Sequence, residues 1–207
     1  VALGDGLGGV AHGIERIGAL AEADDRLAAA KREAEQHRLA AAEAVGALSP
    51  LRFLPLAIRV PQRPLRAIAV GWLTAFPASM ALAFLGSLIL PGAARPEFKV
   101  DGLAAILALV AFAPLVETLI MGSVLLVLLL FLRPAAAVIA SALGWGVAHS
   151  LVAPIWGLVI WWPFLVFSTL FVAWRKRSLL LAFLIPALVH ALQNLVPALL
   201  VAYGAPA

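Results

Sequence analysis

Charged residues are scarce in this chain of 207 residues, and cysteine is absent. Only 13% of the residues are charged and 64% are hydrophobic, whereas soluble domains are about a quarter charged and about half apolar. The lack of cysteine excludes a disulfide framework, a thiolate metal site and a cysteine nucleophile. The low charge and high hydrophobicity predict an all-α fold, a polytopic bundle of membrane helices.

The net charge of +4 is unevenly distributed along the chain. Residues 1–48 carry eight acids and five bases, whereas the remaining residues carry three acids and ten bases. A surplus of bases in a mostly apolar region is typical of loops on the inner side of a membrane rather than of a phosphate-binding face. We therefore expect membrane lipid as a partner and no nucleic acid.

Composition divides the chain into three regions. Residues 1–48 begin with a flexible, glycine-rich lead-in and continue over 14–46 without proline, which predicts a soluble cytoplasmic helix. Its leucines are too sparse for a sustained heptad seam, which favours a solvated helix over a coiled-coil dimer arm. Residues 49–66 mix apolar residues with arginines and prolines, and this mixture predicts a basic lead-in at the level of the lipid headgroups. Residues 67–207 form the membrane domain.

The membrane domain contains apolar segments close to the length of about 20 residues that a hydrocarbon core of about 30 Å requires. If the N-terminus lies inside, the inner segments hold eight bases and the outer loop holds two, so we expect a cytoplasmic N-terminus. Arginine outnumbers lysine 12 to 3, which favours a GC-rich bacterium and therefore its inner, plasma membrane. The sequence predicts about five transmembrane helices, near 67–91, 103–131, 134–151, 155–174 and 179–203.

Four polar side chains lie deep within these predicted spans: Glu117, His149, His190 and Asn194. An ionisable group at this depth costs at least about 2.5 kcal/mol, and such groups usually serve a function. With a rise of about 1.5 Å per residue, Glu117 lies ~21 Å, His149 ~22 Å and His190 ~17 Å from the inner ends of their spans. Singly, each histidine is explained equally well as a hydrogen-bond partner between helices, and Asn194 alone is better explained in that way. Together, at one depth, they predict a single site.

A carboxylate assisted by an imidazole can take a proton from water and return it to a leaving amine. A second imidazole and an amide N–H can stabilise the oxyanion that forms. A Ser-His-Asp arrangement is excluded, because the chain has no second acid at this depth to orient a histidine. A proton relay in a transporter is the alternative use of a glutamate and histidine pair.

Three short motifs carry these residues: APLVETL at 113–119, WGVAH at 145–149 and HALQN at 190–194. In order and spacing they resemble the three motifs EExxxR, FxxxH and HxxxN/B of the CPBP intramembrane proteases. This family includes relatives of the type II CAAX prenyl endopeptidases and of bacteriocin-processing or immunity proteins. The resemblance covers about residues 103–203, half of the chain.

The resemblance implies a role for each of the four polar residues. Glu117 matches the first glutamate of the family, which is thought to activate water, and His149 matches the histidine placed near it. His190 and Asn194 match the third motif, where they would hold the oxyanion. Two histidines and one glutamate could also bind Zn²⁺, but a glutamate that binds metal could not act as the base. We therefore expect a metal-free mechanism without a cofactor.

The chain departs from the family pattern at three positions. Trp145 replaces the usual phenylalanine, Thr118 stands where the second glutamate is expected, and Gly122 stands where the arginine is expected. The joint loss of both charges is coherent, because either one alone would be unpaired within the membrane. From their places in the motifs we expect Trp145 and Thr118 to bind the substrate.

The sequence thus predicts an intramembrane endopeptidase that hydrolyses a membrane-associated peptide or protein. Prenylated substrates follow only from the better-known relatives. The alternatives are a catalytically silent membrane scaffold of the bacteriocin-immunity type, with residues 14–46 as a docking arm, and a proton-coupled transporter.

Overall fold

A computed structural model describes residues 5–93, 96 and 98–204, without the side chains of residues 5–15, 17–19 and 21. These residues are helices joined by short loops, and no strand occurs among them. The chain divides into two units at Leu39, and most of helix α1 (Asp5–Ala47) forms the first. The predicted all-α fold is confirmed.

The first unit is a single solvated helix. Along α1, Arg26 pairs with Glu22, and His37 lies 3.4 Å from Glu33, each pair four residues apart on the helix surface. Leu20 and Leu27 are exposed, as the prediction of a solvated helix over 14–46 requires. Residues 1–4 of the predicted flexible lead-in lie outside the described residues, and α1 already begins at Asp5, earlier than predicted.

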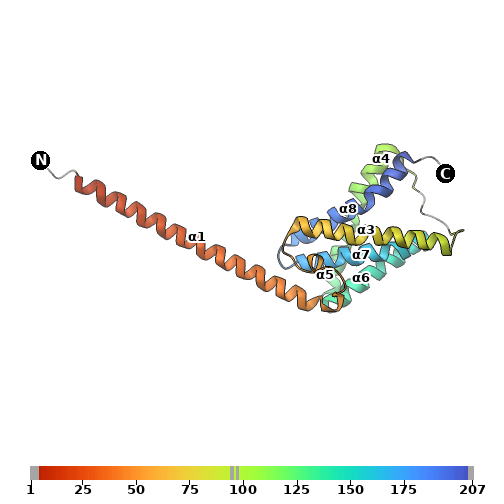
Figure 1. Cartoon of the computed structure of the whole chain (residues 1–207), viewed down its shortest axis with the longest axis horizontal. Helices are drawn as coiled ribbons and strands as arrows, with labels where there is room; N and C mark the ends of the chain where they lie inside the picture. Colours follow the sequence, from red (N-terminus) through yellow and green to blue (C-terminus); the bar gives the residue numbers. More distant parts are fainter. Residues whose placement is uncertain (1–4, 94–95, 97, 205–207) are drawn as a thin grey trace. The chain divides into compact units, whose positions relative to one another are not determined.

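The second unit is a bundle in which helices α3, α6 and α7 lie alongside one another (Figure 1). Helix α7 is at its centre, because α3, α6 and α8 all pack against it. The core is therefore rich in large aromatic side chains from α7. The elements of this unit are η1 (Ser49–Leu51), α2 (Leu56–Arg59), α3 (Pro64–Ile89), α4 (Gly102–Ile106), η2 (Leu107–Phe112), α5 (Ala113–Leu128), α6 (Pro134–Ser150), α7 (Pro154–Trp174) and α8 (Leu179–Tyr203).

Four helical stretches of the described chain are long and apolar enough to cross a membrane. They are α3, the continuous stretch from Gly102 to Leu128, α7 and α8. The predicted count of five is therefore wrong. Helix α6 has 17 residues and a length of about 26 Å at about 1.5 Å per residue, which is less than the hydrocarbon core of about 30 Å. It packs mainly against α7.

The basic lead-in at 49–66 is folded onto the bundle. Leu51, Leu54 and Ile58 are buried in the common core, with exposures of 2%, 2% and 0%. The Arg177 guanidinium, just after α7, donates hydrogen bonds to the carbonyl oxygens of Pro61 and Gln62, just before α3. The end of α7 and the beginning of α3 therefore lie at the same end of the bundle.

Candidate functional site

Two of the polar groups predicted to share a site are brought together by the packing of α5 against α8. His190 Nε2 lies 3.8 Å from Glu117 Oε2. The His190 side chain is 5% exposed, whereas that of Glu117 is 27% exposed, so the carboxylate is the accessible member of the pair. Because no hydrogen bond to this carboxylate occurs among the described side chains, its oxygens can accept a proton from a water molecule.

His149 is held by its own helix. Its Nδ1 lies 2.9 Å from the carbonyl oxygen of Trp145, one turn earlier on α6. A carbonyl only accepts hydrogen bonds, so Nδ1 carries the hydrogen and the neutral ring keeps its lone pair on Nε2. His149 is therefore oriented as a base or acceptor through Nε2. Neither ring nitrogen of His149 lies within 4.0 Å of a Glu117 oxygen, whereas His190 Nε2 does.

An aromatic cluster joins the two histidines, and sequence reasoning did not identify its central residue, Phe164 of α7. The Phe164 ring lies 5.8 Å from His149 and 5.4 Å from His190, measured between ring centroids. Phe167 stacks on His190 at 4.8 Å, and Trp156 meets His149 edge-on at 4.8 Å. Both rings are thus fixed by dispersion contacts. Phe164 carries no sequence signal, because α7 is rich in aromatic residues throughout.

The segment just before Glu117 is a π-helix, η2. Its end is marked by the Ala113 N–H, which donates to the carbonyl oxygen of Ala108, five residues earlier. By the same spacing the carbonyl of Leu109 would pair with residue 114, which is a proline and has no N–H. Leu109 is therefore left with a carbonyl oxygen that the helix itself does not satisfy.

Asn194 supplies the missing donor. Its Nδ2 donates a hydrogen bond of 3.0 Å to the carbonyl oxygen of Leu109, which ties α8 to η2. Unsatisfied backbone groups are costly in the hydrocarbon region, so this bond stabilises the π-helix. One of the two amide hydrogens of Asn194 is thereby occupied. The role expected for Asn194 in stabilising the oxyanion stays a prediction. Only the second hydrogen on Nδ2 is free to donate to an oxyanion.

Replacing Asn194 by leucine should destabilise the bundle by about 1 kcal/mol, the usual size of an interhelical hydrogen bond in a membrane. The physical reason is that Leu109 keeps a carbonyl without a donor. Thermal unfolding in detergent micelles measures the loss, and hydrogen exchange of η2 should become faster. Gln193→Leu is the matched control, because the Gln193 Oε1 is buried without a partner and its removal should cost no stability. Equal losses in both variants would contradict this role of Asn194.

Trp145 connects the histidine cluster to a groove on the outer surface of α5 and α6. Its indole stacks on Phe164 at 4.4 Å, with an interplanar angle of 15°. The groove has a volume of about 400 Å³ and a mostly apolar lining. An apolar segment lying in it would touch Trp145 beside the histidines. The lining residues are Ile120, Val124, Leu128, Ala140, Ser141, Gly144, Trp145 and Ala148.

The two positions where the chain departs from the first family motif are tightly packed. A Cβ atom on Gly122 would lie closer than 3.0 Å to ring carbons of both Phe171 and Phe183. These rings occupy the space that an arginine side chain would need. Thr118 is 1% exposed, and its hydroxyl is buried without a partner. A substrate could reach Thr118 only by displacing its neighbours.

No three His, Asp or Glu side chains among the described residues converge closely enough to hold a metal ion. His149 is the histidine set apart, since a ring nitrogen of His190, and none of His149, lies within 4.0 Å of a Glu117 oxygen. No family model matches the chain, and no curated protein or solved structure matches it either. The geometry of Glu117, His190 and His149 is thus the basis for assigning a function.

Proposed function

We propose that this chain is an integral membrane endopeptidase that uses Glu117 to activate water. The observation that carries the proposal is the pairing of Glu117 with His190 at 3.8 Å, deep within two membrane helices. A partly accessible carboxylate beside an imidazole is costly in hydrocarbon, and it can act as the general base that activates water. No metal or cofactor has a part in the mechanism.

In the proposed reaction, a Glu117 oxygen removes a proton from a water molecule as the water oxygen attacks the carbonyl carbon of the scissile peptide. The resulting oxyanion is stabilised by N–H donors, for which His190 and the free hydrogen of Asn194 are the candidates. The proton then passes from Glu117 to the leaving nitrogen, and the C–N bond breaks. His149 assists through its free Nε2 by orienting the water or the peptide.

The proposed substrate is a membrane-associated peptide or protein. The groove between α5 and α6 supports this, because its lining is mostly apolar and includes Trp145, whose ring lies 5.7 Å from that of His149. We further propose a CPBP-type enzyme in the plasma membrane of a bacterium, with its N-terminus in the cytoplasm. The excess of bases in the predicted inner segments supports this orientation. The contact of Arg177 with Pro61 and Gln62 agrees, since it places two of these segments at one end of the bundle.

Hydrolysis can be tested with the full-length chain in proteoliposomes and a library of peptides anchored in the membrane by acyl, prenyl or helical segments. In water enriched in ¹⁸O, each new carboxyl terminus should carry one ¹⁸O atom, detected by mass spectrometry. Protein-free vesicles provide the background. If the folded protein yields no labelled product from any anchored peptide, the endopeptidase assignment is wrong and a silent scaffold becomes the better explanation.

A further inference from the structure

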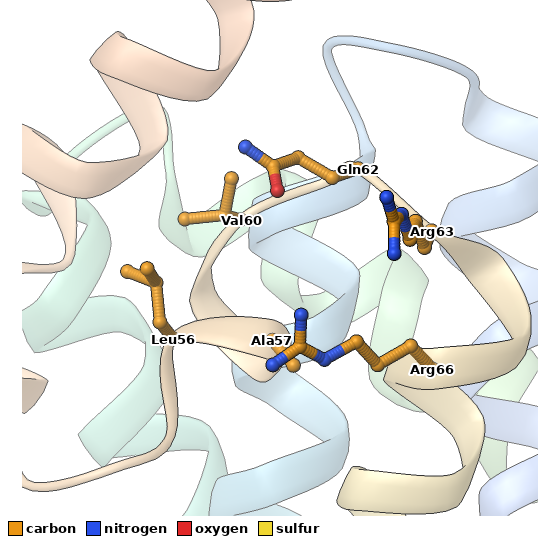
Figure 2. A pocket seen from close by; sticks show the side chains of 6 residues that line it. All are labelled: Leu56, Ala57, Val60, Gln62, Arg63 and Arg66. Atoms are coloured by element: carbon orange, nitrogen blue, oxygen red, sulfur yellow. The ribbon is translucent and has the colours of Figure 1, made fainter.

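A small basic pocket lies between α2 and the beginning of α3, far along the chain from the motif residues. Figure 2 shows Arg63, Arg66 and Gln62 around its opening, with apolar side chains of α2 beside them. Its volume is about 40 Å³, which is room for about three oxygen-sized groups. Arg63 is the N-cap of the membrane-crossing helix α3, so the pocket lies where that helix meets the membrane surface. The lining residues are Leu56, Ala57, Val60, Gln62, Arg63 and Arg66.

The charge of this pocket is uncompensated. Neither Arg63 nor Arg66 has an acidic partner among the described residues, and the sequence has no acid between positions 44 and 96. Both arginines lie at the N-terminal end of α3, where the helix dipole is positive and a cation is unfavourable. An anion bound there would neutralise both guanidinium groups and the helix end. The charge and position of the pocket therefore favour an anionic ligand.

The loop that forms the pocket is already ordered without such an anion. Arg177 Nη1 donates hydrogen bonds of 2.6 and 2.8 Å to the carbonyl oxygens of Pro61 and Gln62. These two acceptors therefore do not compete for Arg63 and Arg66, which keep their hydrogens for a ligand. Bidentate donation from arginine suits the oxygens of a phosphate.

The surroundings of the pocket favour a lipid over a free ion. Leu56 lines the pocket and is 56% exposed, and Leu65, which precedes Arg66 in the chain, is 82% exposed, so exposed apolar side chains accompany the arginines. A phospholipid satisfies both features, with its phosphate on the arginines and its acyl chains on the apolar side chains. The ammonium group of a zwitterionic lipid would add a third positive charge beside the two arginines, and no acid lies nearby in the sequence to offset it, which favours an anionic lipid.

We propose that this pocket binds the phosphate of an anionic phospholipid, independently of any catalytic role of the chain. The test uses the full-length protein in nanodiscs of phosphatidylglycerol and phosphatidylcholine with equal acyl chains, and native mass spectrometry of the retained lipid. The wild type should retain phosphatidylglycerol in preference, and Arg63→Gln/Arg66→Gln should lower this preference by about tenfold or more. Arg52→Gln/Arg133→Gln is the matched control, since it removes two exposed arginines outside the pocket and should keep the preference.

Ala57→Phe distinguishes binding in the pocket from general attraction of lipid to the basic surface. The phenylalanine would fill the cavity and leave every arginine in place. Loss of the preference in this variant supports the proposal, and retention of it overturns the proposal. Equal losses in the two double-arginine variants would also overturn it. Millimolar inorganic phosphate should not displace the retained lipid; displacement would show a site for free phosphate instead. Circular dichroism confirms that each variant is folded.

Discussion

Replacing Glu117 by glutamine should lower the rate of peptide hydrolysis by about 10²–10⁴-fold, the usual contribution of a positioned general base. The amide keeps the shape of the side chain but cannot take a proton from water. His190 Nε2 would then face an amide in place of a carboxylate, at a distance that is 3.8 Å in the native protein. The measurement is the initial rate of ¹⁸O incorporation with a peptide that the wild type cleaves.

Glu43→Gln is the matched control for this variant. Glu43 lies near the end of α1 and is half-exposed. It is paired with Lys176, which follows α7. Loss of an exposed ion pair costs less than about 1 kcal/mol, so this variant should cleave at the wild-type rate. A folded Glu117→Gln protein that cleaves as fast as Glu43→Gln would remove Glu117 from the mechanism.

Replacing Gly157 by alanine should destabilise the bundle by about 3 kcal/mol or more, at the upper end of the cost of overpacking. A Cβ atom at this position would lie closer than 3.0 Å to Ser150 Oγ and to the carbonyl oxygen of Gly146. The serine could rotate away, but the backbone of α6 could not. Thermal or denaturant unfolding in micelles gives the change in stability. Activity should fall as well, because α6 carries His149 and α7 carries Phe164.

Gly144→Ala makes the same chemical change on α6 without the clash. Nothing lies within 4 Å of a Cβ atom at Gly144, which faces the groove between α5 and α6. Alanine is also the better helix former, so this variant should be as stable as the wild type or more stable by up to about 1 kcal/mol. Similar destabilisation in both variants would show that the close approach of α6 and α7 at Gly157 is not what holds them together.

The fold class and most element boundaries were predictable from the sequence. Long apolar runs without charge can satisfy their backbone only as helices in a membrane, and prolines mark where several of them begin. Helix α7 was predicted over 155–174 and occupies Pro154–Trp174, and α8 was predicted over 179–203 and occupies Leu179–Tyr203. The count of five failed at α6, where the predicted span of 18 residues was one residue longer than the helix that forms.

The residues of the candidate site were predictable from two quantities that follow from the sequence alone. These are the free-energy cost of a polar side chain in hydrocarbon and its depth along the predicted helix. An isolated carboxylate, imidazole or amide is expensive in hydrocarbon wherever its helix points. Glu117 and His190 were therefore recognisable before their contact was known. Depth along a helix also follows from counting, since each residue adds about 1.5 Å.

Only the packed structure decided which of these groups meet, because contact depends on the rotation of each helix about its axis. One extra residue in a turn rotates the following side chains by about 100°, and η2 introduces such a change just before Glu117. Pro114 was visible in the sequence, but the resulting free carbonyl of Leu109 and its bond to Asn194 were not. The same holds for His149, which lies beside Phe164 and bonds to its own helix. The sequence by itself determined that a few polar side chains lie deep within apolar helices, because their positions can be counted along each span. Only the packing of α5 against α8 decided that Glu117 and His190 lie next to each other.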